Sequence, residues 1–402
     1  MRVLYLCHRL PYPPDKGDKI RAFHQLRSLA AKHEVDLFTL ADRPEDVANS
    51  TSVRKYCKRI TIAHWSPQLA RLRSLPYLCT QRPLTLPYFY SDELQTGIRR
   101  ALLHRTYDRV LVYCSAMAQY VETVSDVPII TDLVDVDSDK WVQYSQVAQF
   151  PFSTVYRREG RLLQKYEQRV CQKSAAIVVT TEREAQLAQL LLQEPRVHVV
   201  RNGVDGEYFQ PHTVNENARR IIAFLGDMAY FPNQQAVIYF AQKVLPLVRA
   251  SVSDVQFVII GRNPSRSVRR LREIKGVEVT GFVPDVRPYL AKAAVSVAPF
   301  LIAAGIQNKV LEAMASGVPV VATSRVIRSL SKDVGAMVDA GDTPEQMARA
   351  IVALLTNPEL TRIKGMESRR RVTTDYDWQR SSDQLMRILQ EPRSASVTYA
   401  RS

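Results

Sequence analysis

The stretch Ala304–Val321, AGIQNKVLEAMASGVPVV, decides how the rest of the chain is interpreted. The apolar run Val295–Pro299 precedes it, and a loop that ends at Gly305 leads into a helical pattern that Gly317 stops. Val318–Val321 then resumes an extended apolar run, so the stretch predicts strand, glycine turn, helix and strand. Such a turn presents backbone N–H groups and a helix N-terminus at the carboxyl edge of a sheet, which favours a bound phosphate.

Two charged side chains in this stretch fit a nucleotide ligand. Lys309 supplies a cation in the first helical turns, and Glu312 follows three residues later, so both can face the same side of the helix. A carboxylate beside a phosphate site usually binds neutral hydroxyl groups, such as those of a ribose. The stretch therefore predicts a site for a nucleoside diphosphate.

The composition is that of a globular protein with two or three domains. The chain has 402 residues, of which 46% are hydrophobic and 24% charged. Its five cysteines form no CxxC pair, which argues against a disulfide framework or a zinc site and fits a reducing cytoplasm. The N-terminus, MRVLYLCHRLPYPP, lacks the apolar segment of a signal peptide, and no apolar run reaches the roughly 18 residues of a membrane span.

The net charge of +15 leaves four interpretations open: nucleic acid, an anionic membrane surface, anionic small substrates, or a solvated basic surface. No helix-turn-helix, zinc-finger or aromatic RNA-binding pattern supports nucleic acid. The segment Leu69–Tyr90 is rich in proline, arginine and aromatic residues, and it predicts either a rim that touches a membrane or irregular packing between helices. The predicted helix Ser153–Lys173 has basic residues at helical spacing, which form a solvated face or bind anionic lipid. These basic residues are Arg158, Arg161, Lys165, Arg169 and Lys173.

The chain opens with a Rossmann-type unit, in which strand Val3–Cys7, helix Lys19–Lys32 and strand Val35–Leu40 follow one another. The loop His8–Asp18 between the first strand and the helix lacks G-x-G-x-x-G, and Gly17 is its only glycine. Gly17 either contacts a ligand or belongs to a turn in which Asp15 or Asp18 caps the helix.

A polar, turn-rich linker near residue 205 separates two parallel α/β halves, and a second βα series begins with strand Ile221–Leu225, which ends at Gly226. A short strand is predicted at Ala336–Val338. The predicted organisation is an N-terminal Rossmann-like domain at 1–204 and a C-terminal Rossmann-like, nucleotide-binding domain at 205–376. A helix at 377–390 crosses back to the N-terminal domain, and 391–402 is a disordered tail. Ligands of such sheets bind at the carboxyl ends of the strands, here in the cleft between the domains.

The segments that carry a family resemblance cover nearly the whole chain: LPYPPDKGDKIRAFHQL, VDVDSDKW, RNGVD, GDMAYFPN, GFVPDVRPYLAKAAVSVAPF, GIQNKVLEAMASGVPVV and YDWQRSSDQL. With them the chain resembles GT-B fold glycosyltransferases of the family-4 type, and within that group the sugar transferases of exosortase and exopolysaccharide gene clusters. The resemblance implies two Rossmann-like doubly wound domains that face each other across a cleft. It also implies transfer of a sugar from a nucleotide-diphosphate sugar with retention of configuration.

The resemblance also implies roles for individual residues. Glu312 matches the second of two family glutamates and binds the ribose, whereas the first glutamate, which contacts the donor sugar, falls on Ala304. Sugar contacts then pass to Gly305, Gln307 and Asn308.

The cations that clasp the diphosphate in relatives also differ here. Their positions correspond to Asp227 and Asn233, so the phosphate role passes to Lys309, with Arg262 after the next strand. Gly226 lies at the start of this loop and is a further donor-binding candidate.

In the N-terminal half, Gly17 matches the family glycine loop near the donor phosphates and acceptor, and Asp135 or Asp137 stands where relatives carry a histidine. Asp135-Val136-Asp137 has the letters of a DxD metal motif, but it is interpreted as a loop at a strand end, and no metal or cofactor is expected. The departing phosphate then accepts the acceptor's proton, with Asp135 as the alternative base.

Three functions remain open on the sequence. The first is a hexosyltransferase that uses a UDP- or GDP-linked sugar and a glycan or polyprenyl-diphosphate-linked acceptor in exopolysaccharide synthesis. The others are a GT-B fold nucleotide-sugar epimerase and a non-catalytic sugar-nucleotide-binding scaffold. The expected location is the cytoplasm, at the inner face of the cell membrane, with peripheral contact to anionic lipid and no nucleic-acid partner.

Overall fold

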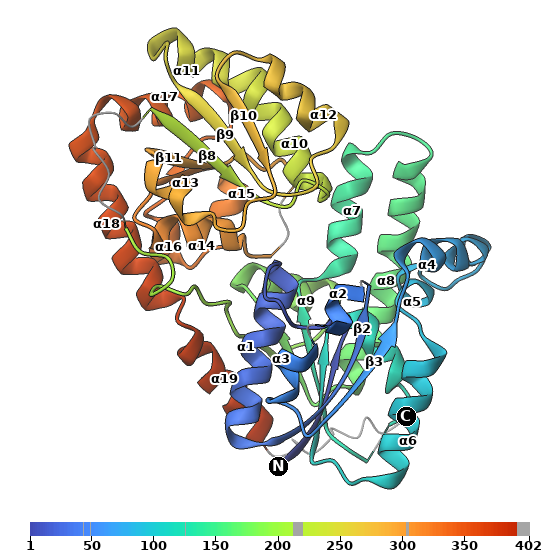
Figure 1. Cartoon of the computed structure of the whole chain (residues 1–402). Helices are drawn as coiled ribbons and strands as arrows, with labels where there is room; N and C mark the ends of the chain where they lie inside the picture. Colours follow the sequence, from blue (N-terminus) through green and yellow to red (C-terminus); the bar gives the residue numbers. More distant parts are fainter. Residues whose placement is uncertain (43, 49, 125, 212–219, 303–304, 392–402) are drawn as a thin grey trace. The chain divides into compact units, whose positions relative to one another are not determined.

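The computed structural model describes residues 1–402 except 43, 49, 125, 212–219, 303–304 and 392–402. The chain divides into two compact units, Met1–Arg201 with Gln379–Ser402, and Asn202–Trp378. The predicted boundaries after residues 204 and 376 lie two or three residues from these divisions. Each unit is an α/β structure built on its own parallel sheet (Figure 1).

The first unit contains a seven-stranded sheet in the order β3-β2-β1-β4-β5-β6-β7, and all its strand pairs are parallel. Its central strands are continuous apolar runs because helices cover both faces of the sheet. The strands are β1 (Arg2–Cys7), β2 (Glu34–Ala41), β3 (Arg59–His64), β4 (Arg109–Tyr113), β5 (Ile129–Val134), β6 (Ala176–Val179) and β7 (Val197–Val199).

The helices of the first unit vary from single turns to the long hairpin of α7 and α8. They are α1 (Gly17–Lys32), α2 (Pro44–Ala48), α3 (Ser50–Arg54), α4 (Pro67–Ser74), η1 (Leu75–Cys79), α5 (Thr85–Tyr88), α6 (Asp92–His104), η2 (Ser115–Tyr120), α7 (Asp137–Val147), α8 (Phe152–Lys173), α9 (Glu182–Leu191) and α19 (Trp378–Gln390). From Gln379 on, α19 belongs to this unit and lies beside α1, where the hydroxyls of Ser28 and Ser382 are 2.5 Å apart (Figure 1).

The second unit contains a six-stranded parallel sheet in the order β10-β9-β8-β11-β12-β13. Its strands are β8 (Ile221–Leu225), β9 (Gln256–Ile260), β10 (Val277–Gly281), β11 (Val295–Ala298), β12 (Val320–Ala322) and β13 (Asp339–Ala340). Its helices are α10 (Phe231–Tyr239), the π-helix η4 (Phe240–Val244), α11 (Leu245–Ser251), α12 (Arg266–Arg270), η5 (Leu271–Glu273), α13 (Arg287–Lys292), α14 (Asn308–Ala315), α15 (Ser324–Ile327), α16 (Lys332–Gly335), α17 (Pro344–Thr356) and α18 (Pro358–Asp375).

Both sheets have a point where the strand order reverses, between β1 and β4 in the first unit and between β8 and β11 in the second. Ligands of doubly wound sheets bind at the carboxyl ends of the strands beside this point. In the second unit, the loops beside this point are the loop after β8 and the loop between β11 and α14. The latter is the stretch with which the sequence analysis began.

Three sequence-based expectations need correction. The strand predicted at Ala336–Val338 is wrong, because α16 continues there as a turn and the strand lies at Asp339–Ala340. On α8, Arg158 is not part of the solvated basic face, since its guanidinium donates to the carbonyl oxygens of Tyr77 and Thr80. Helix α1 begins two residues earlier than predicted, at Gly17.

The described part of the chain contains no helix that is both long enough and apolar enough to cross a bilayer. The predicted tail, apart from Glu391, lies outside the described residues, as do residues 212–218 of the predicted linker.

Candidate active site

The loop after β8 connects three segments of the second unit through Asp227. Its carboxylate accepts hydrogen bonds from Arg262 Nε and Asn263 Nδ2, each at 3.1 Å, and both residues follow β9. Its carbonyl oxygen accepts from Asn233 Nδ2 of α10 at 2.8 Å. Asp227 therefore fixes the β8–α10 loop against the neighbouring β9 loop at the carboxyl edge of the sheet.

Lys309 extends from α14 to the same loop. Its Nζ donates to Asn233 Oδ1 at 2.5 Å and lies 4.9 Å and 4.7 Å from the ring centroids of Phe224 and Phe300. Both rings are almost fully buried, so the ammonium is attracted to two aromatic faces from which water is excluded. Asn233 therefore links the backbone of Asp227 to the lysine.

Two glycines of this loop pair leave room for close approach. A Cβ on Gly226 would lie 2.6 Å from Asn233 Nδ2 and 3.0 Å from Lys309 Nζ. A Cβ on Gly261, whose φ is +151°, would lie only 1.7 Å from the carbonyl oxygen of Gly226. The two glycines let the loops approach each other and leave space for the lysine.

The electrostatics of Lys309 and Glu312 suit an anionic ligand. Burial lowers the pKa of Lys309 to about 7, although the carboxylates of Glu312 and Asp227 partly oppose this. Burial also raises the pKa of Glu312 to about 7, against the influence of Lys309. Both side chains keep some exposed surface, so a ligand can reach them. An arriving diphosphate would favour the charged lysine, because opposite charges at close range stabilise each other.

The turn that leads into α14 has the predicted glycine geometry. Gly305 has a φ of +57°, in the left-handed region that glycine tolerates. Gln307 is the N-cap residue of α14, and Asn308, the first helical residue, accepts a hydrogen bond at Oδ1 from Asn202 Nδ2 at 2.9 Å. Ala304, where relatives carry the sugar-binding glutamate, lies outside the described residues.

Arg262 is nearby but already paired. Its side chain is 17% exposed and forms an ion pair with Asp227. The structure thus brings Gly226, Arg262, Lys309 and the start of α14 to one edge of the second sheet. The sequence pattern missed Asn233 as the acceptor for Lys309, and it missed the two phenylalanine rings.

Asp135 lies in the first unit, at the carboxyl end of β5. Burial raises the pKa of Asp135 to about 6; Lys140 opposes this rise and Asp137 adds to it. The Asp135 Oδ1 accepts a hydrogen bond from Thr180 Oγ1 at 3.2 Å. Asp137 instead pairs with Lys140 at 3.3 Å. Within the described ranges, no group of three or more His, Cys, Asp or Glu side chains is arranged to hold a metal ion.

Gly17 is the exposed first residue of α1. The N-cap residue is Lys16, with no side-chain cap, so neither Asp15 nor Asp18 caps this helix. Asp18 instead accepts from Arg9 Nη1 at 2.6 Å and lies 3.3 Å from His8 Nε2.

His8 follows β1 and stacks on Tyr113 at the end of β4, at the point where the strand order of the first sheet reverses. Burial opposes its charge, but Cys114 and Asp18 outweigh burial and raise the pKa of His8. The structure therefore gives His8 a structural ion pair at the carboxyl edge.

A buried polar network lies under α1, and the sequence pattern hardly indicated it. Arg21 is 1% exposed and donates from Nε to Asp132 Oδ2 at 2.8 Å. Gln25, one turn later, donates to the same oxygen at 2.5 Å, and Tyr5 OH donates to Gln25 Oε1. The i, i+4 spacing of Arg21 and Gln25 beside apolar positions was the available signal, but only the fold shows that Asp132 is their partner.

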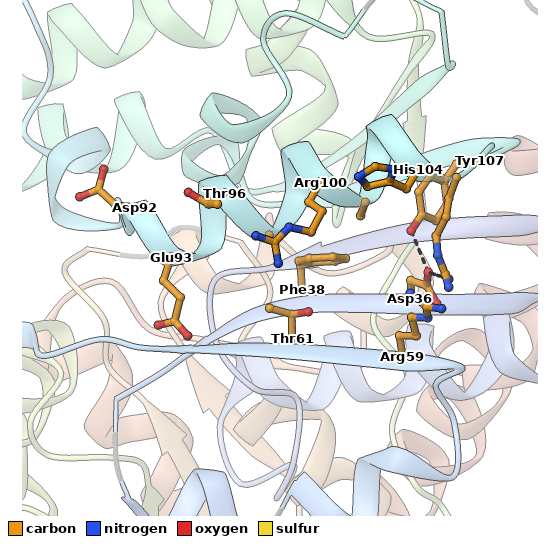
Figure 2. A pocket seen from close by; sticks show the side chains of 13 residues that line it. Asp36, Phe38, Arg59, Thr61, Asp92, Glu93, Thr96, Arg100, His104 and Tyr107 are labelled. Atoms are coloured by element: carbon orange, nitrogen blue, oxygen red, sulfur yellow. Dashed lines mark hydrogen bonds and ion pairs between the residues drawn. The ribbon is translucent and has the colours of Figure 1, made fainter.

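A groove of about 610 Å³ lies between α6 and strands β2 and β3 (Figure 2). Phe38 and Gly97 form part of its lining, and Asp36 accepts from Arg105 Nη1 and Tyr107 OH at 2.7 Å each. Asp36 and Arg59 lie near the amino ends of their strands, away from the carboxyl edge. The groove is therefore separate from the candidate active site.

Structural comparison defines the class of fold. The chain superposes on sucrose-phosphate synthase from Thermosynechococcus elongatus with a TM-score of 0.71 and 17% identity, covering 96% of this chain and 98% of that one. It also superposes on the HepE protein of Anabaena, solved with UDP-glucose, with a TM-score of 0.67 and 13% identity over 97% and 99% of the two chains. The two parallel-sheet units and these neighbours show the two-domain Rossmann-like GT-B fold.

Comparison with protein families then finds a match in each of the two units. Residues 19–203 match the family described as "Glycosyl transferase 4-like domain", and residues 219–357 match "Glycosyl transferases group 1". The two matches together span most of the chain, so each of its two units contains a region that matches a glycosyltransferase family.

Curated relatives share only part of their length with it. A GDP-mannose-dependent alpha-(1-6)-phosphatidylinositol dimannoside mannosyltransferase of Mycobacterium tuberculosis is 32% identical over 34% of this chain and 36% of the relative. An alpha-maltose-1-phosphate synthase of Mycolicibacterium smegmatis is 27% identical over 49% and 57% of the two chains. The chain thus spans between about a third and just over half of these relatives.

Proposed function

We propose that this enzyme transfers a hexose from a UDP- or GDP-linked sugar to a glycan or polyprenyl-diphosphate-linked acceptor, with retention of configuration, in exopolysaccharide synthesis. The observation that carries the proposal is the position of Lys309, which Asn233 holds beside two phenylalanine rings at the carboxyl edge of β8 and β11. The relatives solved with UDP-glucose or named as GDP-mannose-dependent support a nucleotide-sugar donor. They do not distinguish between uridine and guanosine as the nucleoside of the donor.

In this proposal the donor binds to the second unit. The ribose hydroxyls donate to Glu312, and the diphosphate lies against Lys309 and the N-terminus of α14, where backbone N–H groups and the helix dipole favour negative charge. Arg262 adds a second cation, oriented by Asp227. The sugar contacts the turn from Gly305 to Asn308.

The chemistry requires the nucleoside diphosphate to leave with its negative charge stabilised. As the bond between the sugar C1 and the diphosphate oxygen breaks, Lys309 and the helix N-terminus stabilise the charge that develops on that oxygen. The acceptor hydroxyl forms its bond to C1 on the same face, and its proton passes to the departing phosphate oxygen. The alternative proton acceptor is Asp135, whose pKa of about 6 suits a general base near neutral pH.

A lipid-linked acceptor would bring the enzyme to the cytoplasmic face of the cell membrane. This location is part of the proposal, and it follows from the acceptor class rather than from the donor site.

The test is incubation of the full chain with radiolabelled UDP- and GDP-sugars, with and without polyprenyl-diphosphate-linked acceptors. Labelled product only with acceptor, and with the donor's anomeric configuration, supports the proposal. Conversion of the donor sugar without acceptor would indicate an epimerase. Tight nucleotide binding without any turnover would indicate a scaffold, and Lys309→Met is the matched variant in which donor turnover should be lost.

A further inference from the structure

Helix α4 turns its largest apolar side chains toward solvent. Leu69 and Leu72 are 61% and 63% exposed, and Leu75, the first residue of η1, is 55% exposed. The opposite face of the helix buries only the small side chains of Ala70 and Ser74. Because the three leucines are spaced three residues apart, they form one continuous row, which we call the leucine ridge.

This orientation is the reverse of what an amphipathic surface helix normally shows. Such a helix packs its leucines against the core and its polar residues toward water. A contiguous apolar row on the surface of a monomer marks a binding surface, because it remains costly to hydrate until a partner covers it.

The charged residues of the segment that carries the leucine ridge are all basic. Arg71 and Arg73 are exposed on α4 itself, and the sequence contains no acidic residue between Asp46 and Asp92. An occupant of this surface therefore has to offer both an apolar layer and negative charge.

Helix α8 extends this basic surface. Its only acidic residues, Glu159 and Glu167, are 1% and 0% exposed, so they do not offset the exposed cations. The exposed charged residues of α8 are Arg157, Arg161, Lys165, Arg169 and Lys173.

Hydrogen bonds attach the leucine ridge to this helix. Arg158 Nη2 donates to the carbonyl oxygen of Tyr77 in η1 at 2.8 Å. The buried Glu159 carboxylate accepts from the backbone N–H groups of Leu84 and Thr85 at 2.7 and 2.9 Å. The segment that carries the leucines is thus anchored beside the first turns of α8, which Figure 1 shows next to α4.

Exposed aromatic side chains lie at the N-terminal end of the same helix. Phe150, in the connection between α7 and α8, is 83% exposed, and Phe152, the first residue of α8, is 61% exposed. The ring of Phe152 is 6.2 Å from that of Tyr156, which in turn is 5.2 Å from Trp141. Aromatic side chains of this kind are enriched where a protein meets the boundary between lipid headgroups and acyl chains.

We propose that this face of the first unit binds the surface of a bilayer that contains anionic lipid. The leucine ridge enters the boundary between headgroups and acyl chains, and the arginines of α4 and α8 bind the headgroup phosphates. A nucleic acid would satisfy the cations but offers no apolar layer for the leucines. The inference depends on residues of the first unit alone and holds whatever donor the second unit binds.

The experiment measures binding of the full chain to sedimented vesicles of phosphatidylcholine, alone or mixed with phosphatidylglycerol. The wild-type protein is expected to bind the mixed vesicles and to lose this binding as salt is raised. The triple variant Leu69→Gln, Leu72→Gln, Leu75→Gln is expected to bind at least about tenfold more weakly. The matched control is Leu103→Gln on α6, which replaces an 82% exposed leucine outside the ridge and is expected to bind like wild type.

A second pair of substitutions tests the charges. Arg71→Gln with Arg73→Gln is expected to weaken binding to the mixed vesicles about tenfold or more. UDP and GDP affinity, measured on every variant, is expected to stay unchanged, which shows that the fold is intact and keeps this test separate from the donor site.

Three outcomes would overturn the proposal. The wild-type protein could ignore both kinds of vesicle, the leucine variant could bind as tightly as wild type, or phosphatidylcholine alone could bind as well as the mixture. If instead the leucine substitutions turn a dimer in solution into a monomer, the ridge is an interface with a second copy of the chain.

Discussion

At the scale of single residues, Lys309 is the cation proposed to bind the diphosphate, because Asp227 and Asn233 hold the positions where the family resemblance implies cations. Its ammonium lies against two buried rings, where Coulomb interactions are stronger than in water. Asn233 fixes its position with one hydrogen bond and leaves other N–H donors of the ammonium for a ligand. The same burial explains the lowered pKa of Lys309, and a bound anion is expected to raise that pKa and favour the protonated lysine.

The first prediction concerns the pH dependence of nucleotide affinity. The pKa of Lys309 is lowered to about 7, so above pH 7 the lysine loses charge and attracts the diphosphate less. The pKa of Glu312 is raised to about 7, so above pH 7 it becomes a better acceptor for ribose hydroxyls. Lys309 loses charge above its pKa, whereas Glu312 gains its charge as pH rises toward about 7 and is already charged at higher pH. The wild-type affinity is therefore expected to be highest near pH 7 and to fall between about pH 7 and pH 9.

Single variants separate these effects. In Glu312→Gln only the lysine titrates, and UDP or GDP affinity is expected to fall by up to about tenfold per pH unit above its pKa. In Lys309→Met the affinity is expected to rise with pH instead. Calorimetry across the pH range checks both slopes, and a Glu312→Gln profile that stays flat would contradict the assignment of Lys309 to the diphosphate.

The second prediction tests the ribose role of Glu312. Glu312→Ala is expected to weaken UDP or GDP binding by about 1–3 kcal/mol, because hydrogen bonds to a carboxylate are lost. Pyrophosphate has no ribose, so its affinity is expected to stay the same. Competition calorimetry compares the two ligands, and an equal loss for both would show that Glu312 acts on the phosphates or on the fold.

At the scale of elements, the β8–α10 loop holds the lysine in place, and the third prediction concerns its first residue. In Gly226→Ala the new methyl group would displace the ends of Asn233 and Lys309, which are flexible and can move without disrupting the sheet. We expect roughly tenfold weaker nucleotide binding with little loss of stability, since one charge-assisted contact is misplaced. Gly281→Ala is the control, because its Cβ meets nothing within 4 Å although its φ is +79°. It is expected to cost about 1 kcal/mol of stability through backbone strain and to leave binding intact.

The sequence predicted most elements because most of them carry a local signal. Buried parallel strands are apolar runs, and the closing helices α17 and α19 follow amphipathic patterns that end near proline or polar residues. The prediction failed where tertiary contacts or local hydrogen bonds, rather than the apolar pattern, determine the secondary structure. The run Ala336–Val338 looks like a strand, but it turns because Met337 N–H and Val338 N–H bond back to α16.

The candidate site could be predicted only where its residues are close in the sequence. Lys309 and Glu312 lie on one helical turn, so their spacing was visible. The hydrogen bond from Lys309 to Asn233 spans 76 positions, and the pairing of Arg262 with Asp227 spans 35. The buried Arg21–Asp132 pair spans 111 positions, and a helical pattern gives no information about such a partner.

At the scale of the whole molecule, the chain forms most of the first unit, then the second unit, and then returns to the first unit at its C-terminal end. The first unit is completed by the C-terminal helix α19, which follows the entire second unit. The apolar side of α19 joins the same buried cluster as β1 and α1. The stability of the N-terminal sheet therefore depends on residues near the other end of the chain.

The fourth prediction follows from this connection. Leu385 and Leu389 are 1% and 0% exposed, so replacing each with alanine removes buried methyl groups and leaves a cavity. Each substitution is expected to destabilise the first unit by about 2–5 kcal/mol. Arg387→Ala, on the exposed side of the same helix, is expected to change stability by no more than about 0.5 kcal/mol. Calorimetric unfolding, with and without UDP or GDP, distinguishes the units, because nucleotide binding stabilises only the second one. If the leucine substitutions instead lowered the nucleotide-dependent transition, α19 would stabilise the second unit, and the division of the chain described above would be wrong.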